Sequence, residues 1–345
     1  MEALEPMAKM HFSGGVIRNA ERWVIGLVAL TIVLTLLGVA ATSSQSFAEH
    51  WATFPWGAVG ILAAATVVES VLRFWRYHTS CKALGLSIPF WRLMYYYTVG
   101  YALLPTPGKV GTVIRLWLLQ AYHGIPYRRS APLMVMDFVS DAIAMLALGG
   151  LALMVVDHPT MQNLGWVVMI ALGLGVMAVV VAPWVLEAMV GALYVAAGKR
   201  RARLFSRLRG VVRGSAKLGG RILFITSTQC FVGWALVGAA VAHLLTAMGA
   251  PLTMAEGSIV VGIGTMGGFL SMMPAGVGGA EATMGFLLAQ FGVPLATIVI
   301  AVALIRLCGL WLTVLVGLVL VPFALRGAPK RLSQKSKFAE PSRAG

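Results

Sequence analysis

The sequence predicts an all-α polytopic membrane protein with about six transmembrane helices plus two re-entrant helical hairpins, arranged as an inverted 3+3 repeat. The first observation is composition: hydrophobic residues make up 59% of the 345 residues and charged residues 11%, whereas soluble domains have about 25% charged residues. The mean hydropathy is +0.85. So few charges cannot cover a soluble surface, which excludes a soluble enzyme, a nucleic-acid-binding domain and a disordered chain. The other observations are long apolar runs and an internal sequence match.

Six apolar runs each reach the roughly 20 residues that a helix needs to cross a bilayer. They cover residues 23–41, 55–75, 131–156, 164–186, 222–248 and 295–325. The first run follows a leader that spans positions 1–22 and contains the basic residues Lys9, Arg18 and Arg22. Because a signal peptide has an apolar core of roughly 7–15 residues, shorter than this run, we interpret the run as a retained anchor helix.

The runs define one transmembrane domain, residues 23–325, whose two halves are about 23–156 and 164–325. Residues 1–22 form a cytoplasmic N-terminal segment, and residues 326–345 form a basic cytoplasmic tail.

Two further pairs of apolar stretches are too short for each member to cross a bilayer comfortably. Residues 93–104 and 113–122 form the first pair, and residues 257–273 and 280–290 form the second. Broken backbone is tolerated at membrane depth only where protein buries it or where it lines a wet cavity. Each pair therefore predicts a re-entrant hairpin. The breaks contain Pro107, Gly108 and Gly111 in the first hairpin and Pro274, Gly276, Gly278 and Gly279 in the second.

Basic residues predict the orientation of the chain. The loops 42–54, 157–163, 249–256 and 291–294 contain no Lys or Arg. The positive-inside rule therefore predicts a multi-pass protein of the plasma (inner) membrane with both termini in the cytoplasm. The first hairpin then enters from the cytoplasm and the second from outside. The basic connector 199–221 either lies on the cytoplasmic leaflet and attracts anionic lipid or only fixes the topology.

One constant register, which lays position 108 on position 276, superimposes the two hairpin regions. It places run 55–75 on residues 223–243 and run 131–156 on residues 299–324. Three crossings in each half make the halves inverted, and inverted repeats with broken helices are a transporter architecture. Chance matching of Gly and Pro is the alternative. The matched positions are Gly108 with Gly276, Gly111 with Gly279, Gly124 with Gly292 and Pro126 with Pro294.

Few ionisable residues lie within the apolar sequence. A charge at a helix centre costs about 2.5–3.5 kcal/mol on insertion scales, so each one needs a partner, water or a function. Glu69 and Arg73 are spaced i, i+4, which suits an interfacial pair on one helix face.

Asp137 and Asp141 have the same spacing and therefore share a helix face. That face must look into the protein, because two carboxylates facing lipid are untenable. Arg128 or Arg129 near the interface is one source of neutralising charge, and a functional centre is the other interpretation.

The remaining charges lie in the hairpins and the last run. Glu281 either caps the returning half-helix or faces a functional centre. Arg306 lies well inside the last run, which begins at position 295, and needs Glu281 or an anionic substrate group as a partner. Lys109 lies in the first break, where exposed N–H groups suit a phosphate contact. The candidate substrate-binding residues are Lys109, Arg115, Asp137, Asp141, Glu281 and Arg306.

The three cysteines and six histidines show neither metal-ligand spacing nor a nucleophile arrangement. We therefore expect no catalytic residue, no metal site and no cofactor, and we expect that the chain is not an enzyme.

Several motifs, taken together and in order over about residues 20–325, carry a family resemblance. The sequence resembles the lysylphosphatidylglycerol synthase transmembrane-region family, also called flippase-like domain proteins. The motifs are Leu72–Tyr77 followed by Ala83–Gly85, Pro107–Arg115, Asp137–Asp141, and Met273–Glu281 with Arg306.

The resemblance implies a polytopic protein that moves lipids or lipid-linked intermediates between leaflets, with anionic or polyprenyl/hopanoid lipids as partners and no nucleic acid. The aminoacyl-transfer domain of the synthases is not expected, since only positions 326–345 follow the last run. Two departures stand out. Thr112 occupies the place of a family acid, and Phe138 occupies the place of a family arginine, as if a charge pair had been deleted.

The expected function is flippase-like translocation of a lipid or lipid-linked intermediate. A non-catalytic membrane partner of a lipid- or glycan-modifying enzyme is one alternative, and a membrane-embedded enzyme acting on a lipid headgroup is the other.

Overall fold

The computed structural model describes residues 54–106, 110–156, 159–181, 218–271 and 273–326, together with Gly26 and short pieces between 188 and 214. The predicted anchor helix 23–41, the terminal segments and most of the connector 199–221 lie outside the described residues, apart from isolated positions.

Within the described residues every regular element is helical, as the composition predicts. Five helices are long and apolar enough to cross a membrane, and they coincide with five of the six predicted runs. The chain is therefore a multi-pass membrane protein. The five are α4 (Trp56–Ala83), α7 (Tyr127–Val155), α8 (Pro159–Val181), α11 (Gly219–Ala247), and the continuous helix of α14 (Leu295–Arg306), η2 (Leu307–Trp311) and α15 (Leu312–Arg326).

Helix α4 corrects one prediction. The apolar run was expected to end at residue 75, which placed Arg76 in a cytoplasmic loop, yet the helix continues to Ala83. After residue 75 the first helix-breaking residue is Gly85, at φ 66°, and Pro89 follows. Because no Gly or Pro lies between residue 75 and Gly85, the helix continues past its charged residues and takes Arg76 into the protein interior.

Four shorter helices occupy the two hairpin regions. They are α5 (Phe90–Tyr101) and α6 (Val110–His123), and α12 (Met254–Leu270) and α13 (Gly279–Gln290), the last two separated by the 3₁₀ turn η1 (Pro274–Gly276). Helix α12 begins with a capping box, in which the Thr253 backbone N–H donates to Glu256 (2.7 Å) and the Glu256 N–H donates to the Thr253 hydroxyl (3.2 Å).

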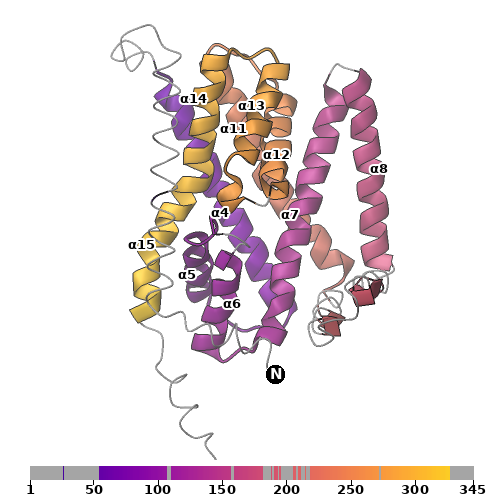
Figure 1. Ribbon diagram of the computed structural model, residues 1–345. Coiled ribbons are helices and arrows are strands. Elements are labelled where there is room, and N and C mark those ends of the chain that lie inside the picture. The colour runs from indigo at the N-terminus through magenta and orange to yellow at the C-terminus, as the bar shows by residue number, and fades with distance from the viewer. Residues whose placement is uncertain are drawn as a thin grey trace, which may run out of the picture.

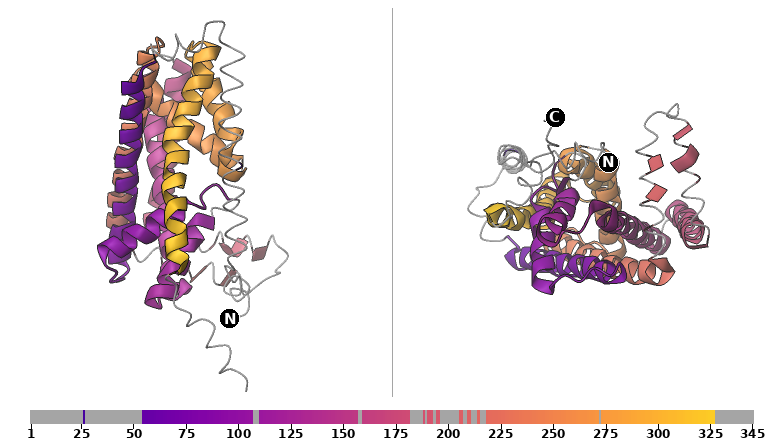
Figure 2. Two further views of the ribbon diagram at one scale, coloured as in Figure 1. Left: turned by 90° about the vertical axis from the view of Figure 1, so that its left-hand side faces the viewer. Right: turned by 90° about the horizontal axis from the view of Figure 1, so that it is seen from below.

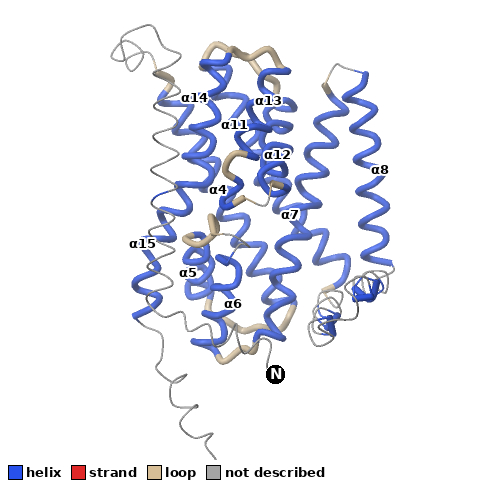
Figure 3. The backbone as a smooth tube through the Cα atoms, viewed as in Figure 1, coloured by secondary structure: helices blue, strands red, loops and turns tan. Residues whose placement is uncertain are grey.

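The two helix pairs lie at opposite ends of the long helices. In Figure 1, α5 and α6 are at the lower end, and α12 and α13 are at the upper end. Figure 3 shows that the break after α5 and the break between α12 and α13 both lie near mid-height, approached from opposite sides. The chain therefore brings its irregular backbone to the middle of the bundle.

Each helix pair sits against its own apolar cluster. The upper cluster joins α11–α14 to the first half of α4, through residues such as Leu62 and Val241. The lower cluster joins α5 and α6 to α15, and it is rich in tyrosine. There the Tyr95 hydroxyl donates to the Leu320 carbonyl (3.1 Å), and the Tyr122 hydroxyl donates to the Ala324 carbonyl (2.7 Å). The views in Figure 2 show α15 running beside the lower pair.

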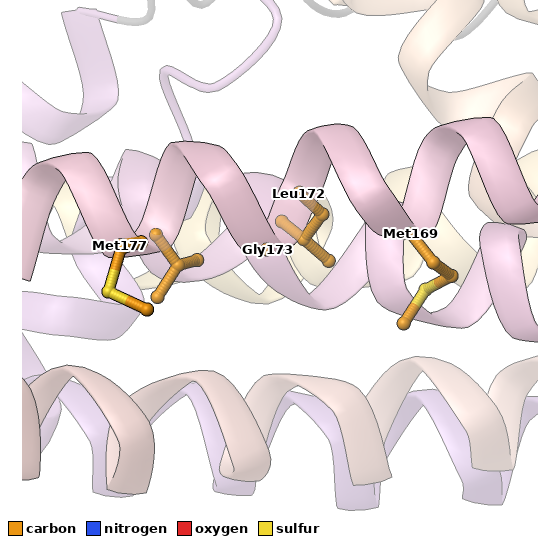
Figure 4. A pocket seen from close by; sticks show the side chains of 5 residues that line it. Met169, Leu172, Gly173 and Met177 are labelled. Carbon is orange, nitrogen blue, oxygen red and sulfur yellow. The ribbon is translucent and has the colours of Figure 1, made fainter.

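Helix α8 differs from the other long helices because it packs mainly on α7 and lies at the margin of the bundle (Figures 1 and 2). Only 6% of the residues in its most apolar stretch are buried, against 28–56% in the other four membrane-spanning helices. A shallow hollow on its surface is lined by Met169, Leu172, Gly173, Val176 and Met177 (Figure 4). This lining contains no charged group, so the hollow suits lipid tails or another apolar helix.

Basic side chains gather at the lower end. Lys82 lies in the last turn of α4, Arg92 and Arg129 lie in the first turns of α5 and α7, and Arg221 lies in the first turn of α11. The upper connections after α11 and α13 contain no Lys or Arg. The positive-inside rule predicts from this one-sided distribution that the lower end lies in the cytoplasm.

Candidate functional site

A group of four charged residues, here called the lower charged centre, forms where α4, α6 and α7 meet. It consists of Arg76, Arg115, Asp137 and Asp141. Arg76 is 2% exposed, and its Nη2 and Nη1 atoms lie 3.2 Å from Asp137 Oδ1 and 2.9 Å from Asp141 Oδ1. One arginine therefore holds both carboxylates of the i, i+4 pair on α7, whose shared face does look into the protein.

Arg115 reaches the same centre from α6. Its Nη1 atom lies 3.5 Å from Asp137 Oδ2, and its Nε donates to the Tyr97 carbonyl at 3.2 Å. The guanidinium also lies 3.7 Å from the centre of the Tyr97 ring and 5.2 Å from that of Tyr101, which adds cation–π attraction. A side chain at Gly100 would overlap Arg115, so α5 needs a glycine at this point.

Polar side chains of α11 complete the lower charged centre. Arg76 Nη1 donates to Cys230 Sγ (2.6 Å), and the Cys230 thiol donates to Asp141 (3.4 Å). One turn away, the hydroxyls of Ser140 and Thr226 share a hydrogen bond of 2.9 Å. Every charge in this centre thus has a buried partner, which is the condition for keeping ionised groups inside a membrane.

The predicted pair of Glu69 and Arg73 is present on α4. The Arg73 guanidinium lies 4.6 Å from the centre of the Trp234 ring on α11, and Glu69 is 6% exposed. A side chain at Gly233 would press on Glu69. The pair is therefore packed into the interface between α4 and α11.

A second group, here called the upper charged centre, consists of Glu281 and Arg306 with the backbone of Ala275. Arg306 Nε lies 2.7 Å from Glu281 Oε1, so Glu281 is one partner of this arginine, as expected from the sequence. Glu281 Oε2 also accepts the Gly278 N–H at 2.7 Å. Glu281 therefore caps α13, as one of its two interpretations holds, and also pairs with Arg306.

Arg306 also holds the break in the second helix pair. Its Nη2 donates to the Ala275 carbonyl at 2.6 Å, and Ala275 has φ 58° and ψ 5°. A left-handed conformation at a residue with a side chain costs energy and persists only when its surroundings hold it. The charged side chain and the irregular backbone therefore stabilise each other.

A π-helical turn, η2, follows Arg306 directly. Such turns are rare and occur frequently at functional sites, because they insert a residue into a helix without ending it. The turn lies at the junction between the upper and lower helix pairs, since α14 packs on α13 and α15 packs on α5.

The structure divides the predicted site residues into two sets. Arg115, Asp137 and Asp141 meet in the lower charged centre, and Glu281 and Arg306 meet in the upper one. Lys109, with Pro107 and Gly108, lies outside the described residues. Arg128 or Arg129 was the alternative source of charge to neutralise Asp137 and Asp141. Arg129 gives this alternative no support, because it donates to the Gly85 carbonyl (3.2 Å).

Sequence reasoning missed one member of the lower charged centre and one polar residue in contact with it. Arg76 was placed outside the membrane, although the absence of Gly and Pro between it and Gly85 could have kept it on the helix, one turn beyond Arg73. Cys230 gave no signal, because a single cysteine in an apolar run has no distinguishing pattern. Among the described residues, no group of three or more His, Cys, Asp or Glu side chains could hold a metal ion.

The two residues that depart from the family pattern are a buried threonine and a phenylalanine that contacts another aromatic ring. Thr112 is buried, at 6% exposure. Phe138 lies between Asp137 and Asp141 in the sequence, and its ring centre is 6.4 Å from that of Phe269, near the end of α12. An aromatic contact thus connects α7 to the upper helix pair.

Comparison with known protein families gives a match over most of the chain. The model of the family described as the lysylphosphatidylglycerol synthase TM region matches residues 23–317. No curated protein matches the chain.

Proposed function

We propose that this chain, which belongs to the lysylphosphatidylglycerol synthase TM-region family, moves a lipid or lipid-linked intermediate with an anionic headgroup between the leaflets of the membrane. The observation that carries the proposal is the upper charged centre, where Arg306 holds both Glu281 and the carbonyl of the strained Ala275. An anchor needs neither buried charge nor broken backbone, whereas a path for a charged headgroup uses both.

Exchange of partners at Arg306 provides a mechanism. The guanidinium has five N–H donors in a planar fork that suits phosphate and carboxylate oxygens. In the resting arrangement Glu281 and the Ala275 carbonyl occupy donors. The Glu281 side chain is 30% exposed, so it can turn toward water when an anionic headgroup takes its place. Release of the headgroup then restores the resting pair.

The inverted repeat and the re-entrant course of the two helix pairs are part of this proposal. The register that lays Gly108 on Gly276 places α6 on positions 278–291, and α13 is Gly279–Gln290. The same register relates two left-handed turn glycines, Gly124 (φ 66°) and Gly292 (φ 75°). Helices α7 and α14 both begin after an extended proline, at ψ 145° and ψ 143°. These matches support two halves built to one plan.

A transport assay with a matched pair of glutamates tests the proposal. Glu256 and Glu281 each accept the backbone N–H of an N-cap residue at 2.7 Å, but Glu281 also forms an ion pair with the buried Arg306. The chain would be reconstituted in vesicles with fluorescent phosphatidylglycerol, and transfer between leaflets would be followed by quenching from outside. We expect Glu281→Gln to slow transfer at least about tenfold, the effect of losing one charged hydrogen bond.

Glu256→Gln is the control and should leave transfer within about twofold, because it removes only a helix cap. Equal transfer by the wild-type chain and by protein-free vesicles would contradict the proposal outright. Equal slowing by both variants would assign the effect to capping and not to the charged centre.

Orientation is tested separately. In a cysteine-free background, Thr160→Cys and Leu252→Cys lie at the upper end, and Ser87→Cys lies at the lower end. The proposed topology requires an impermeant thiol reagent to label the first two in whole cells and to spare the third. The reverse pattern would place the basic end outside.

A second candidate function is a non-catalytic membrane partner of a lipid- or glycan-modifying enzyme. Helix α8 favours it, because side chains such as Trp166 (57% exposed) and Leu174 (67% exposed) present an apolar face that no described element covers. Lipid tails cover such a face equally well, so the upper charged centre makes transport the stronger proposal.

A further inference from the structure

We propose that the corner between α4 and α5, at the lower end of the bundle, binds the phosphate-bearing headgroup of a lipid. This site is distinct from both charged centres, and the transport function does not require it. The corner forms where the chain leaves α4, makes a left-handed turn at Gly85 (φ 66°) and enters α5 after Pro89. Figure 3 shows this connection at the lower end of the molecule.

The corner contains a pocket of about 460 Å³. One wall presents His78 and Lys82, which are spaced i, i+4 on α4 and so share a helix face. Leu86 and Leu93 form an apolar floor and are 5% and 1% exposed. A wall with one lysine cation and a histidine N–H donor, above an apolar floor, matches a lipid at the point where its phosphate joins its glycerol and acyl chains.

The positive charge around the pocket has no acidic counterpart nearby in the chain. Between Ser70 and Met136 the sequence has eight Lys and Arg residues and no Asp or Glu. Three of the eight are engaged in buried pairs. Arg129 crosses from α7 to donate to the Gly85 carbonyl at 3.2 Å, which brings a further cation to the rim. Lys82 and Arg92 are exposed. Uncompensated cations of this kind attract an anion.

Aromatic side chains place the pocket at the depth of lipid headgroups. Trp75 and Trp91 are 55% and 72% exposed, and they precede the pocket residues His78 and Leu93 by three and two positions on α4 and α5. Exposed tryptophans are enriched where a membrane meets water. His78 also packs edge-on against Phe90, with ring centres 5.4 Å apart, so the wall of the pocket is held in place by the first residue of α5.

A free phosphate and a lipid headgroup share the same recognition chemistry, and the apolar floor favours the lipid. Solvent-exposed phosphate would gain only from the charges. A lipid gains from Ile88 and Pro89 as well, which line the pocket and are still accessible, because burying apolar surface contributes about 25 cal/mol per Å².

Binding to the purified full-length chain in detergent tests the site. The probes are short-chain phosphatidylglycerol, short-chain diacylglycerol and inorganic phosphate, measured by titration calorimetry. The variant is His78→Gln with Lys82→Gln. The matched control is Arg221→Gln, an exposed cation at the same end of the bundle that does not line the pocket. We expect the double variant to weaken phosphatidylglycerol binding at least about fivefold, the effect of one cation near a membrane surface.

Each outcome decides the matter. Selective weakening in the double variant, with wild-type affinity in Arg221→Gln, supports the site. Equal binding by all three proteins overturns it. Diacylglycerol binding as tight as phosphatidylglycerol binding overturns the role of phosphate, and inorganic phosphate binding as tight overturns the role of the lipid. Vesicle transfer that fails while phosphatidylglycerol still binds at the corner would refute the proposed transport and leave this site intact.

Discussion

In the lower charged centre, two arginines from different helices share two carboxylates on α7, and a thiol and a backbone carbonyl take further donors. In the upper charged centre, one arginine is shared between one carboxylate and the carbonyl of a strained residue. As side chains, Asp137 and Asp141 are 9% and 23% exposed, whereas Glu281 is 30% exposed. The same kinds of group are therefore more enclosed in the lower region than in the upper one.

This difference indicates a structural role for the lower charged centre and partner exchange in the upper one. An enclosed network with several partners for each charge fixes helices relative to one another, because loosening one partner leaves others in place. A single pair beside strained backbone can exchange its partner with little change elsewhere. We therefore expect mutations in the lower charged centre to affect folding first and mutations in the upper one to affect activity first.

The largest expected effect comes from Arg76→Ala. Removing this side chain leaves two carboxylates facing one remaining arginine in a buried place, and breaking a buried pair costs about 3–5 kcal/mol. The folded fraction in detergent should fall sharply, measured by thermal unfolding and size-exclusion chromatography. Arg92→Ala, at an exposed arginine one helix away, should unfold like the wild type. Normal unfolding of Arg76→Ala would show that the lower charged centre is not structural.

A charge swap separates folding from activity in the upper charged centre. Arg306→Glu alone places two carboxylates together, and Glu281→Arg alone places two guanidiniums together. The double variant restores an opposite pair, so it should recover folding better than either single variant, measured as the unfolding temperature. Transfer activity need not return, since an anionic headgroup would meet the charges in exchanged places. Strictly additive losses in the three variants would mean that the pair contributes nothing.

Gly111 in the lower helix pair and Gly279 in the upper one occupy the same position of the proposed repeat, so they allow the two regions to be compared. A side chain at Gly111 would overlap the backbone carbonyl of Gly100, whereas one at Gly279 would first meet the side chain of Ser271. Backbone yields less readily than a side chain, so Gly111→Ala should cost about 1–3 kcal/mol and Gly279→Ala less. The measurement is the unfolding temperature of the two variants. A larger loss from Gly279→Ala would reverse the assignment of rigid and adaptable regions.

The smallest expected effect is a gain. Ala275→Gly removes the side chain from a residue at φ 58° and relieves about 1 kcal/mol of left-handed strain, partly offset by the greater freedom of glycine in the unfolded chain. Thermal stability should rise slightly. A clear loss of stability would show that the methyl group of Ala275, which packs near Trp311, contributes more than the strain costs.

The long helices could be predicted because hydrophobic runs report membrane crossings directly. The contact between Glu281 and Arg306 could also be predicted, because the short turn between α13 and α14 leaves these helices little choice of neighbour. Arg76 could not be placed in this way. Its partners lie 61 and 65 residues away on α7, and only the packing of α4 across α7 brings them together. The π turn likewise has no local sequence signal.

The π turn has a geometric consequence. One inserted residue advances the helix by about 100° relative to an uninterrupted α-helix, so α14 and α15 present different sides to the rest of the bundle. Helix α14 uses its side against α13, and α15 uses its side against α5, where a side chain at Gly317 would strike the backbone of Ala102. The last helix thus presents two rotated faces, one to each helix pair, so a rotation of this helix beside Arg306 would also turn the face that packs on α5.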